Sequence, residues 1–454
     1  MKTCATIWTP RTRRDFLQGT AAGFGWLAFS ALTAAAAERA PANPLEPKKP
    51  HFKARAKRVI FLFMQGGPSQ LDTFDWKPEL ARVGKGGAHQ LLGSVAEFKP
   101  RGQSGLMISD VFPNIAAHAD QLCLLHGVKT STASHAQATV ALHTGSENFV
   151  RPSMGAWIVY GLGSVAEDLP GFVTIDPIHD QGGAMNYGSA FLPATFQGTP
   201  LGGAQRGMPN LAPLAESDRE QRRQLDFVQR LNRRLAEQHP IQPEIEGVIQ
   251  SYELAYRMQT SVPNVLDVEN ESAATRALYG LDDRATECFG RQCLLARRLA
   301  EKGVRFIQVT QAGWDHHNNL RSGLADRGQA IDRPIAGLLA DLAQRGLLAD
   351  TLVIWGGEFG RSPYDDKGNG DGRGHHNQGY TMWMAGGGAK GGYVHGATDE
   401  VGRTAVEGIM PIHDVHATIL HLLGLDHEAL TYRYAGRDFR LTNVSGKVAR
   451  EILS

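Results

Sequence analysis

The chain has 454 residues, of which 42% are hydrophobic and 20% charged, so it can form one large domain or a core domain with an insertion. Without the leader described below, 47−4 = 43 basic and 46−1 = 45 acidic residues remain. A net charge of −2 leaves no electrostatic footprint for nucleic acid or for an anionic membrane, and we therefore expect neither as a partner.

Residues 1–37 are predicted to be an export signal. Arg13-Arg14 form a twin-arginine pattern, a Gly/Ala-rich stretch follows, and Ala35-Ala36-Ala37 provide a small-residue cleavage site. The glycines in that stretch make it a poor transmembrane anchor. We expect export by the twin-arginine (Tat) translocase to the periplasm or the cell exterior, with no stable membrane anchor. The Pro- and Lys-rich segment 38–57 is predicted to be an extended linker.

Apolar runs of the kind found in strands buried on both faces follow the linker. They occur at 58–64, 122–126, 171–175, 305–309, 351–355 and 381–385. Helical patterns occur at 217–238, 243–259, 284–302, 332–345 and 413–423. This alternation predicts an α/β domain over 58–450, built on a mostly parallel sheet with helices on both faces. Residues 177–285 interrupt the rhythm and are predicted to be a helical insertion or cap.

The cysteines argue against both a disulfide framework and a thiolate zinc site. Cys4 leaves with the leader, and Cys123, Cys288 and Cys293 remain, an odd number without a Cys-x-x-Cys pair.

Carboxylates and imidazoles follow the predicted strands. Asp315 and His317 come after the 305–309 strand, and their i, i+2 spacing puts both on one face. Glu358 follows the 351–355 strand, and His375-His376 precede the 381–385 strand. Because chemistry in such sheets gathers at the carboxyl ends of the strands, we predict a metal site there. Zinc is favoured, with manganese, calcium or iron as alternatives.

Three longer segments carry a family resemblance. Residues 64–78, 151–157 and 356–361 resemble the exported bacterial DUF1501 proteins, and the likeness extends over 58–445. That family has no settled function, but its layout is similar to the alkaline phosphatase and sulfatase superfamily. The resemblance therefore implies an alkaline phosphatase/sulfatase-like core and, with it, a metallohydrolase site.

The superfamily layout suggests where a nucleophile would lie. Its members place a nucleophile at the start of a helix that ends in Thr-Gly, here Thr144-Gly145, and counting back reaches His135 with Ser134 beside it. Three alternatives remain: Ser134 as nucleophile, His135 as nucleophile, or His135 as a metal ligand with water attacking directly. We favour the third. A hydrogen-bonded structural role for His135 is the simpler alternative.

The same layout suggests metal ligands. It implies Asp315 and His317 as ligands and His376 as the last one, with His375 in reserve or hydrogen-bonded behind it. Asp72 is the nearest carboxylate to the first strand, where the superfamily has a ligand and this chain has Gln65-Gly66; a turn or helix-cap role is its alternative.

Two further residues complete the predicted site. Glu358 is expected to bind metal or act as a general base, or else to cap a helix or pair with Arg361. Arg361 is expected to hold a phosphate or sulfate oxygen, with a surface role as its alternative. Because two of the superfamily's ligand positions are missing, one ion is expected rather than two.

These residues predict an exported metal-dependent hydrolase. Its substrate would be a small anionic phosphate or sulfate ester, such as a phosphorylated or sulfated saccharide, and a water bound by the metal would be its nucleophile. One alternative is an inactive descendant of the fold that binds glycans. Another is an assembly factor that docks through the helices at 217–260.

Overall fold

The computed structural model describes residues 43–82, 90–202, 217–238 and 243–454. The predicted export signal and the first residues of the linker lie outside these ranges. Within them, no helix combines the length and the apolar character that crossing a bilayer requires. The three described cysteines, Cys123, Cys288 and Cys293, are free.

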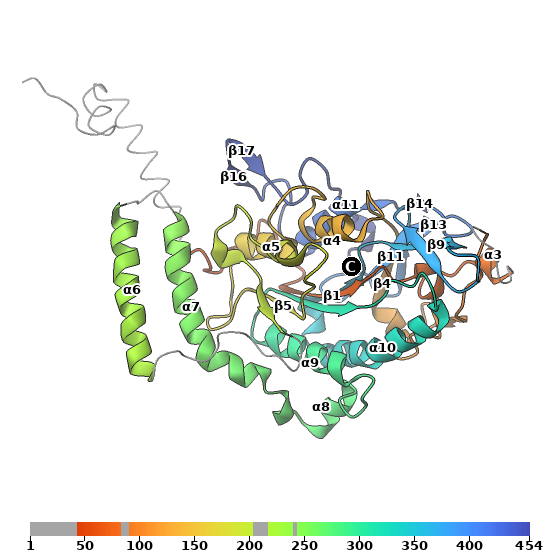
Figure 1. The fold of residues 1–454 in the computed structure, drawn as a ribbon, viewed down its shortest axis with the longest axis horizontal. Coiled ribbons are helices and arrows are strands. Elements are labelled where there is room, and N and C mark those ends of the chain that lie inside the picture. Colours follow the sequence, from red (N-terminus) through yellow and green to blue (C-terminus); the bar gives the residue numbers. More distant parts are fainter. Residues whose placement is uncertain (1–42, 83–89, 203–216, 239–242) are drawn as a thin grey trace, which may run out of the picture.

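A nine-stranded sheet forms the centre of the fold (Figure 1). Its strands, in spatial order, are β12 (Tyr393–His395), β4 (Leu122–Lys129), β11 (Tyr380–Ala385), β8 (Thr351–Gly356), β1 (Arg58–Gln65), β7 (Phe306–Ala312), β5 (Phe172–Ile175) and β6 (Thr199–Leu201), with β15 (Met410–Pro411) paired to β4. Only β11 runs against its neighbours β4 and β8; the other described pairings are parallel. The predicted α/β class and mostly parallel sheet are confirmed.

Strand β1 shows why the apolar runs become central strands. Its register pairs Val59 with Phe306 of β7 and with Leu352 of β8. Alternate β1 side chains enter two hydrophobic clusters, one on each face of the sheet. A strand that packs on both faces needs apolar residues at every position, which accounts for its unbroken run.

Helices cover both faces. Helices α9 (Glu287–Glu301) and α10 (Leu320–Gln344) lie below the sheet in Figure 1, and α4 (His135–Thr144), α5 (Met154–Leu162) and α11 (Ile412–Leu422) lie above it. Helix α10 begins twelve residues before the predicted start at 332. Pro334 lies inside it, and the turns before the proline bury Leu320, Leu324 and Ile331. A proline removes one helical hydrogen bond, and this packing outweighs that loss.

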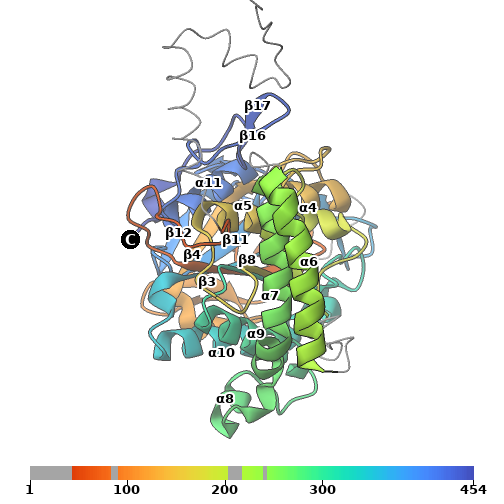
Figure 2. The same ribbon diagram turned by 90° about the vertical axis from the view of Figure 1, so that its left-hand side faces the viewer.

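The predicted insertion at 177–285 has two parts. Strand β6 joins the edge of the main sheet beside β5, whereas α6 (Asp218–Gln238) and α7 (Pro243–Leu266) form a helical hairpin. This hairpin stands at one side of the molecule (Figures 1 and 2), followed by α8 (Ala273–Leu278).

Short elements complete the fold. The hairpin of β9 (Gly360–Asp365) and β10 (Arg373–His376) lies at the other side of the molecule from α6 and α7 (Figure 1). The remaining elements are α3 (Pro78–Ala81) and the strand pairs β2 (Phe98–Arg101) with β3 (Leu106–Ser109), β13 (Ala397–Thr398) with β14 (Ala405–Glu407), and β16 (Tyr432–Tyr434) with β17 (Arg437–Phe439).

Candidate metal centre

A cluster of polar side chains lies where neighbouring parallel strands end. Asp315 follows β7 by three residues and Glu358 follows β8 by two, while His135 is the first residue of α4 and His375 lies on β10. The main sheet thus positions the two carboxylates, and a helix and a separate hairpin bring the imidazoles to them.

Asp315 is the centre of this cluster. Its Oδ2 lies 3.3 Å from Nε2 of His135, and its Oδ1 lies 3.1 Å from Nε2 of His317 and 3.2 Å from Nε2 of His375. The two latter Nε2 atoms are 2.8 Å apart. The donor atoms of His135, Asp315 and His375 all lie within 4.8 Å of one another. His135, Asp315 and His375 therefore present their donor atoms to one point, and His317 lies beside them in contact with Asp315 and His375.

An acceptor holds the far nitrogen of each imidazole. Nδ1 of His135 lies 2.6 Å from Oε1 of Glu358, and Nδ1 of His317 lies 2.9 Å from Oδ2 of Asp366. Nδ1 of His375 lies 2.9 Å from the backbone oxygen of Ala133. When Nδ1 carries the proton that these acceptors need, each Nε2 presents its lone pair to the cluster. This is the arrangement that protein metal sites use to orient histidine ligands.

His135, Asp315 and His375 fit a zinc-sized cation. Tetrahedral nitrogen and oxygen ligands at about 2.0–2.1 Å from zinc lie about 3.3 Å from one another. The contacts around Asp315 span 3.1–3.3 Å, whereas Nε2 of His317 lies 2.8 Å from Nε2 of His375 and outside the group that the other three donors form. In addition, Nε2 of His135 is buried, and its 3.3 Å approach to Oδ2 of Asp315 lacks the geometry of a hydrogen bond. A buried nitrogen left without a partner is costly, and a cation would satisfy it.

The same contacts perturb two titrating groups. Burial by itself would lower the pKa of His135, but the carboxylates of Asp315 and Glu358 raise it to about 9. Burial would raise the pKa of Asp315, but His135, His375 and Arg361 beside its carboxylate hold it well below its usual range. Without a cation, His135 therefore balances the two carboxylates as an imidazolium.

Glu358 supports the cluster from behind. It is completely buried and accepts the backbone N–H of Gly66 at 2.9 Å, besides holding His135. Gly66 has φ 114°, and a Cβ there would lie 2.6 Å from the backbone nitrogen of Asp315. Only glycine allows the end of β1 to approach the loop after β7 this closely. Oε1 holds both His135 and Gly66, and Oε2 accepts the same Gly66 N–H at 3.2 Å, which favours a positioning role over ligation.

Arg361 does not have the role that the sequence suggested. It is completely buried, and its guanidinium donates to the backbone oxygens of Gly66, Gly67 and Arg373 and to Asp315. These bonds use four of its five N–H donors on the protein itself. The predicted role of Arg361 as a clamp on a substrate oxyanion is therefore corrected. Arg361 instead joins β9 to the end of β1 and fixes Asp315.

Asp72 and His376 are not brought into the cluster. Asp72 is completely buried and forms an ion pair with Arg373, with Nε 2.7 Å from Oδ2, and it also accepts the backbone N–H of Val95. His376 follows His375 on a strand, so it points to the opposite face, and Asp399 and Arg403 are its charged neighbours. The predictions of Asp72 and His376 as metal ligands are therefore corrected. His375, which the sequence suggested as the alternative to His376, lies in the cluster.

Ser134 lies directly before the cluster. It is exposed at the N-cap of α4, and its side chain makes no capping hydrogen bond. Helix α4 ends at Thr144, and Gly145 follows in a left-handed conformation, where the sequence placed the helix end. The hydroxyl is thus next to His135 in sequence, on the solvent side.

The sequence interpretation missed Asp366, which holds His317. Its side chain is 30% exposed, and it lines a hollow of about 560 Å³ that also reaches His375 and Arg403. Asp365 and Asp366 follow Arg361 closely, and this carboxylate pair was the signal available in the sequence.

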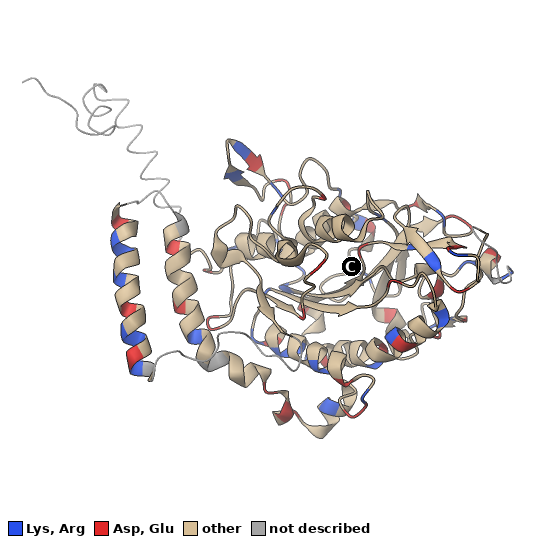
Figure 3. Cartoon of the chain, viewed as in Figure 1, with Lys and Arg blue, Asp and Glu red and all other residues tan. Residues whose placement is uncertain are grey.

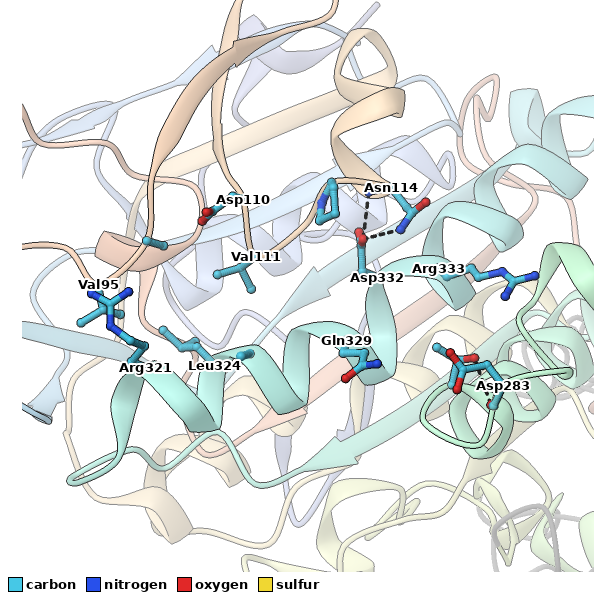
Figure 4. Close-up of a pocket in the computed structure, with 14 residues that line it drawn as sticks. Val95, Asp110, Val111, Asn114, Asp283, Arg321, Leu324, Gln329, Asp332 and Arg333 are labelled. Atoms are coloured by element: carbon cyan, nitrogen blue, oxygen red, sulfur yellow. Dashed lines mark hydrogen bonds between the residues drawn. The ribbon is translucent and has the colours of Figure 1, made fainter.

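A second hollow lies away from the cluster (Figure 4). This groove of about 470 Å³ lies beside α10, with Asp110, Asp283 and Arg333 on its walls. The carboxylate of Asp332 accepts the backbone N–H and side-chain amide of Asn114 there, as Figure 4 shows. These hydrogen bonds account for the buried carboxylate of Asp332 without a ligand. No predicted site residue lines the groove.

The chain resembles several solved structures at low identity. The lipoteichoic acid synthase LtaP from Listeria monocytogenes is 10% identical with a TM-score of 0.39, over 87% of this chain and 78% of that one. The PsFucS1 sulfatase from Pseudoalteromonas sp. is 14% identical with a TM-score of 0.36, over 89% and 72%. The alkaline phosphatase from the Antarctic bacterium TAB5 is 12% identical with a TM-score of 0.32, over 83% and 99%. Sulfatases and alkaline phosphatases are thus among the similar structures, but likenesses this weak carry no argument about activity.

No curated protein matches the sequence. The family model described as "Protein of unknown function (DUF1501)" matches residues 56–453, nearly all of the described chain. The chain therefore belongs to the DUF1501 family, as its sequence motifs indicated.

Proposed function

We propose that this chain is an exported hydrolase of phosphate or sulfate esters that depends on one divalent cation, with zinc favoured. One observation carries the proposal: three imidazoles whose Nδ1 atoms each face an acceptor present their Nε2 atoms around the Asp315 carboxylate. His135, His375 and Asp315 would hold the cation, and His317 beside them would complete the set. A bound zinc ion polarises a substrate oxygen and lowers the pKa of a coordinated water to about 7.

The protein's own residues would set up that chemistry in two ways. Glu358 and Asp366 orient His135 and His317 and keep their Nε2 atoms available. Arg361 fixes Asp315 and offsets part of the negative charge at the centre.

The exposed side of the cluster leaves access to a substrate. The side chain of Asp315 is 44% exposed and that of His317 is 29% exposed, so an ester can approach from the solvent. The nearby hollow with Arg403 and Asp366 would receive the rest of the ester. Direct attack by water suits the site better than a covalent step on His135, because both of that ring's nitrogens face carboxylates.

The test combines metal content with turnover. The purified mature protein should contain close to one zinc or manganese ion and should hydrolyse 4-nitrophenyl phosphate or 4-nitrophenyl sulfate. A chelator should stop turnover, and added metal should restore it. Asp315→Asn should lose both metal and turnover, whereas Asp110→Asn, a carboxylate in the separate groove, should keep both. Equal metal content in the two variants would refute the ligand assignment.

A glycan-binding role without catalysis is the second candidate. The engagement of Arg361 favours it, because four of its five N–H donors are used on the protein and are not free to stabilise an oxyanion. This alternative expects metal to bind but both aryl esters to remain intact. Binding to a sulfated or phosphorylated glycan would then survive Asp315→Asn.

Export is a separate part of the proposal and has its own test. Replacing Arg13 and Arg14 by lysine should retain the full-length chain in the cytoplasm, whereas the wild type should be recovered from the periplasm or the medium. Recovery of both from the same fraction would refute export by the twin-arginine route.

A further inference from the structure

A small hollow lies at the other end of α4 from the metal cluster. Its volume is about 130 Å³, and its walls come from the end of α4, residues 145–152, α5 and the segment around β17. His135 begins α4, whereas Gly145, which follows the helix, lines the hollow. Ten helical residues, or about 15 Å, separate the two places. The hollow is therefore not part of the cluster around Asp315.

The walls of this hollow carry positive charge. Arg151, Arg437 and Arg440 line it, and we call it the arginine hollow; none of the described residues that line it is Asp or Glu. The hollow beside His375 and the groove beside α10, in contrast, both have aspartates on their walls. Arg440 pairs at 3.1 Å with Glu428, which lies outside the lining. The charges of Arg151 and Arg437 remain to be balanced.

Arg151 and Arg437 have no acidic partner. Within the described ranges the guanidinium of Arg151 forms no hydrogen bond or ion pair, and that of Arg437 donates to the neutral Oδ1 of Asn443 at 2.6 Å. Both guanidinium groups lie over the ring of Phe439, at 4.3 Å and 4.8 Å from its centre. Burial and the positive charge of Arg437 both lower the pKa of Arg151. The ring offsets part of this repulsion, and an anion in the hollow would offset more of it.

The β16–β17 hairpin directs its charges to two sides. Arg437 and Phe439 are two residues apart on β17, so they share a face, and both line the arginine hollow. Asp438 lies between them in sequence and points to the other side, where it pairs with Arg433 at 3.2 Å. Figure 3 shows these bands of opposite charge on the hairpin. The carboxylate of β17 is therefore turned away from the hollow.

Aromatic rings complete the walls and the rim. Phe149 and Phe191 line the arginine hollow together with Phe439, and Phe149 is 65% exposed. Phe191 also stacks on Tyr434, with ring centres 5.0 Å apart and planes at 15°. Exposed rings offer flat apolar faces on which the C–H face of a sugar can pack. A ligand that combines a negative charge with such a face matches these walls better than a bare anion does.

We propose that the arginine hollow binds a sugar ring that carries an anionic group: a carboxylate, a sulfate or a phosphate. The anionic group lies beside Arg151 and Arg437, whose planar guanidinium groups fit oxyanions, and the sugar ring packs on Phe149. The volume admits the charged group and little more, so the rest of a longer saccharide lies outside the hollow. The site needs neither a metal ion nor ester hydrolysis, and it therefore does not depend on the function proposed above.

The first test is calorimetry with glucose 6-sulfate, glucose 6-phosphate and glucuronate on the mature wild type and on Asp315→Asn. At least one of these sugars should bind both proteins with equal affinity. Neutral glucose and the matching inorganic anion should bind at least about tenfold more weakly. No binding of any of the three sugars, or equal affinity for the inorganic anion, would overturn the proposal. Binding that is lost in Asp315→Asn would place the ligand at the metal cluster and overturn it as well.

The same titration on variants locates the ligand. Arg151→Gln and Arg437→Gln should each raise the dissociation constant about tenfold or more, because each removes a charge-assisted contact. Arg433→Gln is the matched control: it lies on the same hairpin, is 68% exposed and pairs with Asp438, so its affinity should stay close to that of the wild type. Unchanged binding by Arg151→Gln, or an equal loss in Arg433→Gln, would refute the site.

A further measurement needs no substitution. Phenylglyoxal modifies accessible guanidinium groups, and peptide mass spectrometry shows which arginines have reacted. A saturating amount of the sugar that binds should slow the modification of Arg151 and Arg437 but not that of Arg433. Equal modification of Arg151 with and without the sugar would overturn the proposal, even where the Arg151→Gln variant fails to fold.

Discussion

Replacing His375 by alanine should remove the bound cation, and replacing His376 should not. The two histidines are neighbours on β10, but Nε2 of His375 lies 3.2 Å from Asp315 while His376 faces the side of Asp399 and Arg403. The pair is a matched comparison within one strand, because both changes remove an imidazole from the same element.

The size of the effect follows from the number of donors. Zinc binding to a complete four-ligand site has an apparent free energy of about 10–16 kcal/mol near pH 7. The share of one ligand is one quarter of that, about 2.5–4 kcal/mol. Losing it should raise the zinc dissociation constant about 100- to 1000-fold. His376 contacts no donor of the cluster, so His376→Ala should change the zinc dissociation constant less than about threefold.

Competition with a chromophoric chelator measures both dissociation constants, and circular dichroism checks that both variants are folded. Equal zinc affinities for the two variants would refute the choice of ligands. A larger loss for His376→Ala would restore the original sequence prediction and reverse the orientation of β10 described above.

Three further outcomes are expected. Asp72→Ala should lower the free energy of unfolding by about 3–5 kcal/mol, because it leaves the buried Arg373 without its carboxylate; a urea titration showing almost no change would contradict this. Glu358→Gln should weaken zinc binding about 10- to 100-fold through its effect on His135, and unchanged affinity would exclude the positioning role. Burial lowers the pKa of His143 to about 4, below the value of about 6.5 for an unfolded imidazole. The stability that it contributes is complete above about pH 6.5 and is lost as the pH falls towards 4. Between pH 7 and 5 the wild type should lose about 2 kcal/mol more than His143→Gln, and parallel stability curves would refute the assignment.

The sequence alone determined the class of fold and much of the cluster. Unbroken apolar runs predict buried parallel strands because both faces of such strands must be covered, and β1, β7 and β8 appear where those runs lie. Since parallel strands end at one edge of the sheet, Asp315 and Glu358 could be expected to lie close together. Those inferences use only local pattern and the geometry of a sheet.

Only the tertiary structure decided which neighbours complete the cluster. The register of β10 against β9 turns His375 inward and His376 outward, and a shift of one residue would exchange them. Asp72 pairs with Arg373, which lies 301 positions away in the sequence. Arg361 donates to the backbone oxygen of Gly66, which lies 295 positions away. Such long-range partners decide whether a charged side chain is free to bind a ligand, because a buried charge must be paired or hydrogen-bonded within the folded chain.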